Sequence, residues 1–146
     1  MKKLLLISLL AALWSQSCHA QKRPCSLADS EQADREASKQ RSWNSLYRSY
    51  HRFAPRCDDG SIAEGYSNSV VRILVDHWDT LPRLSELAAN HQGFESFVLR
   101  HVDATVDGAD LDKIRAKASH SCPAGQNDLC RRLRRAADRA LKEPYS

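Results

Sequence analysis

The stretch SIAEGYSNSVVRILVDHW, Ser61 to Trp78, carries the strongest fold signal in the chain. Its apolar side chains recur at three- and four-residue spacing, which is the period of an α-helix. One face carries Ile62, Tyr66, Val70, Ile73, Leu74 and His77, and beside it lie Val71, Val75 and Trp78. A stripe this wide is typical of a helix that is covered on several sides. We therefore predict a central helix with the other segments packed around it.

The segment before this helix, RCDDGSIAEG, places a cysteine and a glycine among carboxylates. A calcium loop of the EF-hand type needs ligands at alternating positions, whereas Asp58 and Asp59 are adjacent and their side chains would point apart. A turn followed by a helix start explains the same residues. Asp59 or Ser61 then caps the helix, and Glu64 lies near the positive end of its dipole.

The first turns of the central helix also suggest a surface and a packing contact. The charges of Asp58, Asp59 and Glu64 form a candidate binding surface at the helix start. Gly65 lies inside the helix, where glycine costs about 1 kcal/mol relative to alanine. We therefore expect a neighbouring helix to approach closely at Gly65.

The flanking segments are also helical in composition and spacing. Residues 26–53 carry an apolar stripe in their C-terminal half and read as one helix, which Pro55 ends. Further helices are predicted over Thr80–Ala89, Phe94–Thr105, Leu111 to before Pro123, and Gln126–Lys142. The prediction is an all-α fold, with residues 21–146 forming one compact bundle of five to six helices held by two disulfides.

The first twenty residues have the pattern of a signal peptide. Lys2 and Lys3 precede the apolar run LLLISLLAALW, which is too short for a membrane span of ~20 residues. Small residues at Cys18 and Ala20 fit cleavage after Ala20, and lipoprotein cleavage before Cys18 is the alternative. We expect a periplasmic or secreted protein without an integral membrane segment once the signal is removed.

The charge of the remaining chain is nearly balanced but unevenly distributed. Without the two signal-peptide lysines, 20 basic and 18 acidic residues leave a net charge of +2, which argues against nucleic acid as a partner. Residues 57–110 are acidic, and residues 21–56 and 111–146 are basic. We expect the basic flanks to pack beside the acidic middle. A partner-binding patch on the last helix, whose five arginines lie between 131 and 139, is the alternative.

Four cysteines remain after signal removal, namely Cys25, Cys57, Cys122 and Cys130. An even number in an oxidising compartment predicts two disulfides. An unbroken helix over residues 26–53 would separate Cys25 from Cys57 by some 40 Å at ~1.5 Å per residue, far beyond the ~6 Å of a bridge. The preferred pairing is therefore Cys57 with Cys122 and Cys25 with Cys130. A kink near residues 37–41 would reopen the local pairing, because the segment from Cys122 to Cys130 is short enough to close on itself.

No common catalytic or cofactor motif is present, so the sequence predicts no cofactor and no metal site. His120, Cys122 and Cys130 have no common zinc spacing, and secreted thiols usually oxidise. The chain has no Gly-x-Ser-x-Gly setting and no glycine-rich phosphate loop. His77 and His101 fall on apolar faces, where we expect satisfied core or boundary histidines.

The segments CDDGSIAEGYSNSVVRILVDHW and FESFVLRHVDATVD, with the later Cys122-Pro123, resemble a set of small secreted bacterial proteins without an assigned function. The resemblance covers Trp43 to Pro123 and implies no activity. In general plan the chain is also similar to helical periplasmic immunity proteins, including those that neutralise type VI secretion amidase effectors. That similarity lies in the signal peptide, helical body and disulfides, and it assigns no role to any residue.

Two functional hypotheses follow. The favoured one is a non-enzymatic binding protein of the bacterial envelope, of inhibitor or immunity type, whose partner is another envelope or secreted protein. The alternative is a small envelope hydrolase whose site assembles only in three dimensions. A deep pocket that joins a histidine to a carboxylate would favour the hydrolase, with these candidates: His77, His101, Asp76, Asp79 and Asp103.

Overall fold

The computed structural model describes residues 24–143, so the expected signal peptide over residues 1–20 lies outside the described part. Residues 24–143 form seven α-helices and one short 3-10 helix, with no strand. The helices are α1 (Leu27–Ala37), α2 (Trp43–Arg52), α3 (Gly60–Asp76), η1 (Trp78–Thr80), α4 (Leu81–Asn90), α5 (Gln92–Arg100), α6 (Gly108–His120) and α7 (Asn127–Ala140). The all-α prediction is confirmed, but the expected count of five to six helices is too low. None of the described helices is long and apolar enough to cross a membrane.

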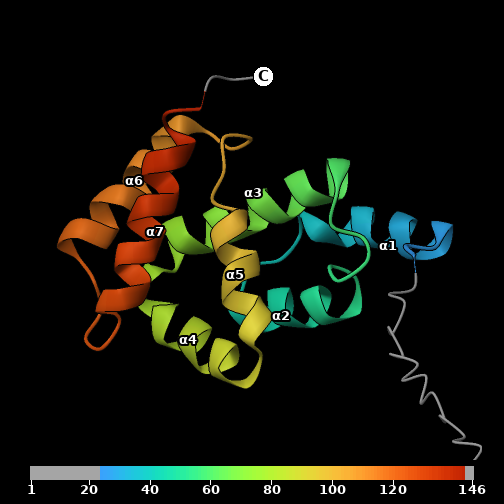
Figure 1. Ribbon diagram of the computed structural model, residues 1–146, viewed down its shortest axis with the longest axis horizontal. Coiled ribbons are helices and arrows are strands. Elements are labelled where there is room, and N and C mark those ends of the chain that lie inside the picture. Colours follow the sequence, from blue (N-terminus) through green and yellow to red (C-terminus); the bar gives the residue numbers. More distant parts are fainter. Residues whose placement is uncertain (1–23, 144–146) are drawn as a thin grey trace, which may run out of the picture.

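Helix α3 is the central element, as its wide apolar stripe predicts. It lies between α1 at one end of the molecule and the pair α6 and α7 at the other (Figure 1). Tyr66, Val70 and Leu74 of α3 are completely buried, and apolar side chains from all seven helices join one continuous core. His77 differs from the prediction, since it ends α3 as an exposed residue.

The predicted single helix over residues 26–53 is wrong, because the chain breaks between Ala37 and Trp43. Ser42 caps α2 in a reciprocal arrangement with Ser45. Across the break, Ser69 of α3 donates to the carbonyl oxygen of Ala37 at 2.5 Å. Its Oγ also accepts the backbone N–H of Gln40 at 3.2 Å. Backbone groups that lose their helical partners are thus satisfied by a side chain from a distant segment.

This break explains the disulfide pattern. Because α2 folds back along α1, Cys25 and Cys57 lie 5.2 Å apart between Cα atoms and are bonded to each other. Cys122 and Cys130 form the second bridge, with Cα atoms 6.1 Å apart. Two disulfides are confirmed, but the preferred pairing of Cys57 with Cys122 and Cys25 with Cys130 is wrong. Because Cys122 and Cys130 are bonded to each other, they supply no thiolate to a zinc site with His120.

The close approach expected at Gly65 is confirmed. A Cβ atom at this position would lie 2.9 Å from the Cβ of Ala37 and 3.2 Å from the backbone nitrogen of Ser38. The C-terminal end of α1 therefore rests directly on the backbone of α3. A side chain at residue 65 would push these two helices apart.

Helices α6 and α7 form an antiparallel hairpin at the opposite end of the molecule (Figure 1). The two helices bury small and medium-sized side chains, namely Leu111, Ile114, Ala118, Leu129, Leu133, Ala136, Ala137 and Ala140. Two long side chains attach the hairpin to the end of α3. The Trp78 indole donates to the Ser121 carbonyl at 2.8 Å, and the Lys117 ammonium donates to the Val75 carbonyl at 2.8 Å.

Candidate functional site

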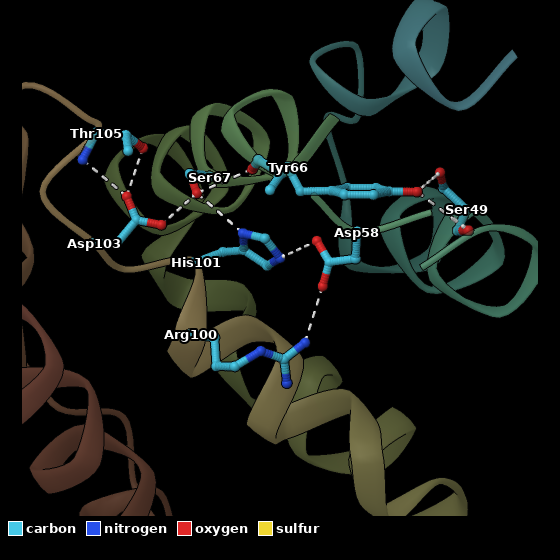
Figure 2. A network of polar contacts seen from close by, with 9 residues as sticks. Ser49, Asp58, Tyr66, Ser67, Arg100, His101, Asp103 and Thr105 are labelled. Atoms are coloured by element: carbon cyan, nitrogen blue, oxygen red, sulfur yellow. Dashed lines mark hydrogen bonds and ion pairs between the residues drawn. The ribbon is translucent and has the colours of Figure 1, made fainter. Parts of the chain in front are cut away.

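A polar network lies where the start of α3 meets the end of α5 (Figure 2). At its centre is His101, which follows the last turn of α5 and is 4% exposed. The Nδ1 atom of His101 lies 3.0 Å from the Oγ of Ser67 on α3. Its Nε2 atom lies 3.1 Å from Oδ1 of Asp58, in the turn before α3. Neither Nε2 nor Oδ1 meets hydrogen-bond geometry with any described residue, so the 3.1 Å ion-pair contact is the polar contact on which both atoms depend.

The network extends at both ends to further charged groups. Arg100 donates to Oδ2 of Asp58 at 3.0 Å. Ser67 donates to Oδ2 of Asp103 at 2.7 Å, and the backbone N–H of Thr105 donates to Oδ1 of the same carboxylate at 2.9 Å. Ser67 therefore links Asp103 to His101, and His101 in turn lies against Asp58.

The electrostatics of Asp58 follow from this arrangement. Partial burial by itself raises the pKa of its carboxyl group. The hydrogen bond and charge of His101, followed by those of Arg100, act in the opposite direction and outweigh burial, so the net pKa of Asp58 is lowered. Its side chain is only 13% exposed. Asp58 is therefore an ionised partner of the network and contributes little to the outer surface.

Ser67, His101 and Asp58 are the residue types of a hydrolase triad, but their setting differs from one. Ser67 is 1% exposed and lies within α3, whereas a catalytic serine of the Gly-x-Ser-x-Gly type stands on a sharp turn open to substrate. A carbonyl carbon would have to approach its Oγ to be attacked. The closed geometry instead fits a polar clamp that joins α3, α5 and the preceding turn.

A second buried contact fixes the same part of α3 to α2. The Tyr66 hydroxyl lies 3.0 Å from the Oγ of Ser49, and Tyr66 itself is fully buried (Figure 2). Burial is the main cause that raises the pKa of Tyr66 to about 12. The phenol therefore stays neutral and serves as a structural hydrogen-bonding group.

The three residues of the predicted binding surface at the start of α3 do not all face the solvent. Asp58 points inward to His101, as described above. Asp59 is the exposed N-cap residue, although its side chain makes no capping hydrogen bond, and Glu64 is exposed on the first turns of α3. Only Asp59 and Glu64 therefore remain as outward charges from this predicted set.

The clefts that Asp76 and His77 line in the described part of the chain do not join a histidine to a carboxylate. Asp76 lines a cleft of about 350 Å³ together with Asp107, Asp110 and Lys113, and no histidine belongs to that lining. His77 lines a separate cleft of about 280 Å³ whose lining contains no carboxylate. His101 does reach Asp103, but only through the buried Ser67. His101 is buried, as predicted, but its Nε2 atom has an ion-pair contact with Asp58 rather than a well-aligned hydrogen bond.

Helix α7 carries an exposed basic surface, which we call the arginine face and define as Arg131, Arg134, Arg135 and Arg139. Arg131 pairs with Asp128 one turn earlier on the same helix. The side chains of Arg134, Arg135 and Arg139 form no ion pair or hydrogen bond within residues 24–143. Helix α7 packs on α5 of the acidic middle, as expected, and Arg132 is the arginine of α7 that forms an ion pair there among the described residues, with Glu95. Most of the positive charge of α7 therefore points away from the rest of the described protein.

Within residues 24–143 no group of three or more His, Cys, Asp or Glu side chains is arranged to hold a metal ion. No protein-family model matches the chain, and neither a curated protein nor a solved structure is significantly similar to it. The resemblance to secreted bacterial proteins and to immunity proteins therefore stays a prediction.

The role of Ser67 and the partner of Asp58 were not predicted from the sequence. One signal for Ser67 was present, because it lies seven residues before the buried Leu74 and so falls on the inward side of α3. A polar residue on a buried helical face needs a partner. No sequence signal shows that this partner is His101, which lies 34 residues further along the chain.

Proposed function

We propose that this chain is an exported, non-enzymatic binding protein of the bacterial envelope, of inhibitor or immunity type, that uses the arginine face to hold an acidic protein. The observation that carries the proposal is the closure of Ser67 and His101, which are 1% and 4% exposed. Ser67 and His101, the residues best suited to hydrolytic chemistry, are thus buried and connect α3 to the end of α5. The two disulfides are compatible with an oxidising compartment.

The arginine face has the properties of a recognition surface. Guanidinium groups bind carboxylates through two parallel hydrogen bonds, which adds geometric specificity to charge attraction. Arg134, Arg135 and Arg139 have no internal carboxylate to satisfy them among the described residues. They project from a helix whose opposite side is fixed on α6, and Cys130 ties the start of α7 to the preceding loop. A rigid helix loses little conformational entropy when a partner binds.

The test is capture of a partner by the processed, oxidised protein from envelope extract, followed by affinity measurement with the purified partner. The double variant Arg134→Glu/Arg135→Glu should weaken binding at least tenfold, because like charges would then face each other. The matched control is Arg35→Glu/Arg48→Glu, which makes the same charge change at exposed positions on α1 and α2. Binding that survives the α7 variant, or falls equally with both variants, would overturn the assignment of the arginine face.

A hydrolase is the second candidate, and one observation favours it. Ser67, His101 and Asp58 form a continuous hydrogen-bonded and ionic chain, which is the order of groups that activates a serine nucleophile. Catalysis would require the connection between α5 and α6 to open and expose Ser67. Ester turnover by the wild type that disappears in Ser67→Ala, while the variant keeps its helical content, would favour this candidate over the binding protein.

A further inference from the structure

Two histidines from different elements lie side by side on the surface. His51 is in the last turn of α2 and is exposed, and His91 separates α4 from α5 and is half-buried. The centroids of their imidazole rings are 4.3 Å apart, with the ring planes nearly perpendicular. Two rings that bind one ion in adjacent positions have centroids about 4.5 to 5 Å apart, given metal–nitrogen bonds of about 2.0 Å. The separation of His51 and His91 is close to this value.

Tyr50 orients the second histidine of this pair. Its hydroxyl group lies 3.4 Å from Nδ1 of His91, and its ring packs beside the His91 ring with centroids 5.4 Å apart. When the hydroxyl oxygen accepts the Nδ1 proton, the lone pair of His91 is on Nε2. A hydrogen bond of this kind on the non-coordinating nitrogen is the usual support of a histidine ligand in metal sites.

We propose that His51 and His91 form a two-histidine site for a borderline divalent transition metal such as Cu²⁺, Ni²⁺ or Zn²⁺, with water in the remaining coordination positions. Imidazole nitrogen selects these ions over Mg²⁺ and Ca²⁺, which prefer oxygen ligands. Small ring rotations of the exposed His51 bring both donor nitrogens to one ion. The bound ion joins the end of α2 to the connection between α4 and α5.

This bridge predicts a stability effect in addition to binding. An ion that binds only the folded arrangement stabilises it in proportion to the logarithm of its concentration over the dissociation constant. The midpoint of thermal unfolding should therefore rise as Cu²⁺ is added. Substitution of either histidine should remove the rise.

The experiment is calorimetric titration of the processed, oxidised protein with Cu²⁺, with Mg²⁺ as the hard-ion comparison. We expect one Cu²⁺ per chain, no Mg²⁺ binding, and two nitrogen ligands in the Cu²⁺ electron paramagnetic resonance spectrum. His51→Ala and His91→Ala should each raise the dissociation constant at least tenfold, and Tyr50→Phe should raise it about tenfold by releasing His91. The matched control is His120→Ala, which removes an exposed histidine at the end of α6.

Each result bears directly on the proposed site. Because His51 is exposed, its substitution leaves the core intact, and circular dichroism confirms folding of every variant. Saturable binding that His51→Ala and His91→Ala abolish and His120→Ala retains would support the site. Absence of saturable Cu²⁺ binding, or binding that persists in the folded His51→Ala variant, would overturn it. Neither outcome alters the role proposed for the arginine face, since that face lies on α7.

Discussion

The two ends of the molecule are both helical hairpins closed by a disulfide, yet they are held together differently. At the α1–α2 end, Cys25 and Cys57 close a loop with a sequence separation of 32, and large side chains such as Trp43 and Phe53 fill the core. At the α6–α7 end, Cys122 and Cys130 have a separation of only 8, and much of the interface is alanine.

The difference shows where stability and recognition are concentrated. The α1–α2 end depends on a few large contacts, on the long-range cross-link and on the buried network at Asp58. The α6–α7 end depends on many small contacts between closely packed helices, so its outer side is free to carry unpaired arginines. We expect substitutions at the first end mainly to change stability, and charge substitutions at the second end mainly to change binding.

The largest contrast is expected from core truncation. Phe53→Ala should lower the free energy of unfolding by about 4 kcal/mol, because Phe53 is completely buried and leaves a cavity. Ala137→Gly, the corresponding truncation in α7, should cost about 1 kcal/mol through helix propensity. Urea unfolding measures both values. Equal losses of unfolding free energy in the two variants would mean that the α1–α2 end does not depend more strongly on large buried side chains than the α6–α7 end.

Removal of each disulfide should give a similar but smaller contrast. The chain-entropy relation gives about 3.7 kcal/mol for Cys25→Ser/Cys57→Ser and about 2.5 kcal/mol for Cys122→Ser/Cys130→Ser, because the first closes the longer loop. Denaturant unfolding of the two double variants tests this order. A larger loss for the second variant would show that the short bridge holds more of the fold than its loop length indicates.

The ionic contacts at the two ends should also differ. Asp58→Ala should cost about 2 kcal/mol at neutral pH, because it leaves the buried His101 without its partner. Asp138→Ala removes an exposed carboxylate that lies 4.0 Å from Arg115, and it should cost about 0.5 kcal/mol or less. Thermal or urea unfolding at pH 7 compares them. A similar small loss for both would show that the Asp58 contact is no stronger than a surface pair.

The pH dependence of stability gives a further test of Asp58. Its pKa is lower in the folded protein than the ordinary value of 3.8, so its stabilising contribution is complete above that value. The contribution is lost as the pH falls from 3.8 through the lower folded pKa, since the unfolded chain then binds the proton first. Asp58→Ala should therefore show a shallower loss of stability on acidification than the wild type. If the wild type and the Asp58→Ala variant lose stability equally as the pH falls below 3.8, the lowered pKa of Asp58 is contradicted.

A modest effect, similar in size to that of Ala137→Gly, is expected at the contact between α1 and α3. Gly65→Ala would place a methyl group 2.9 Å from the Cβ of Ala37, so the two helices must separate slightly. We expect a net loss of about 1 kcal/mol, since overpacking outweighs the gain in helix propensity. Increased stability in urea would show that α1 adjusts without strain.

The sequence predicted the features that depend on local periodicity, and it failed where distant segments decide the structure. The central helix, the close approach at Gly65 and the buried His101 follow from helical spacing and glycine chemistry. The break after Ala37 has no proline or glycine signal, because Ser69 satisfies its exposed backbone groups from 29 to 32 residues away. The wrong disulfide pairing followed directly from that missed break.

The candidate site shows the same limit. His101 and Asp103 were recognised as histidine and carboxylate candidates, but their link through Ser67 needs the packing of α5 on α3. The basic composition of α7 was evident from the sequence. That Arg134, Arg135 and Arg139 form no ion pairs with residues 57–110 depends on how α6 packs against the alanine-rich face of α7. Local residue chemistry was therefore predictable, and the partners of these residues were not.

The central claim is that Ser67 and His101 form a closed structural clamp in a binding protein. Incubation of the folded, oxidised protein with a fluorophosphonate probe, followed by intact-mass and peptide mass spectrometry, tests it most directly. We predict no adduct on Ser67 under conditions that fully label an ordinary serine hydrolase. Stoichiometric labelling of the wild type at Ser67, with no adduct on the Ser67→Ala variant, would contradict the account and identify Ser67 as an accessible nucleophile.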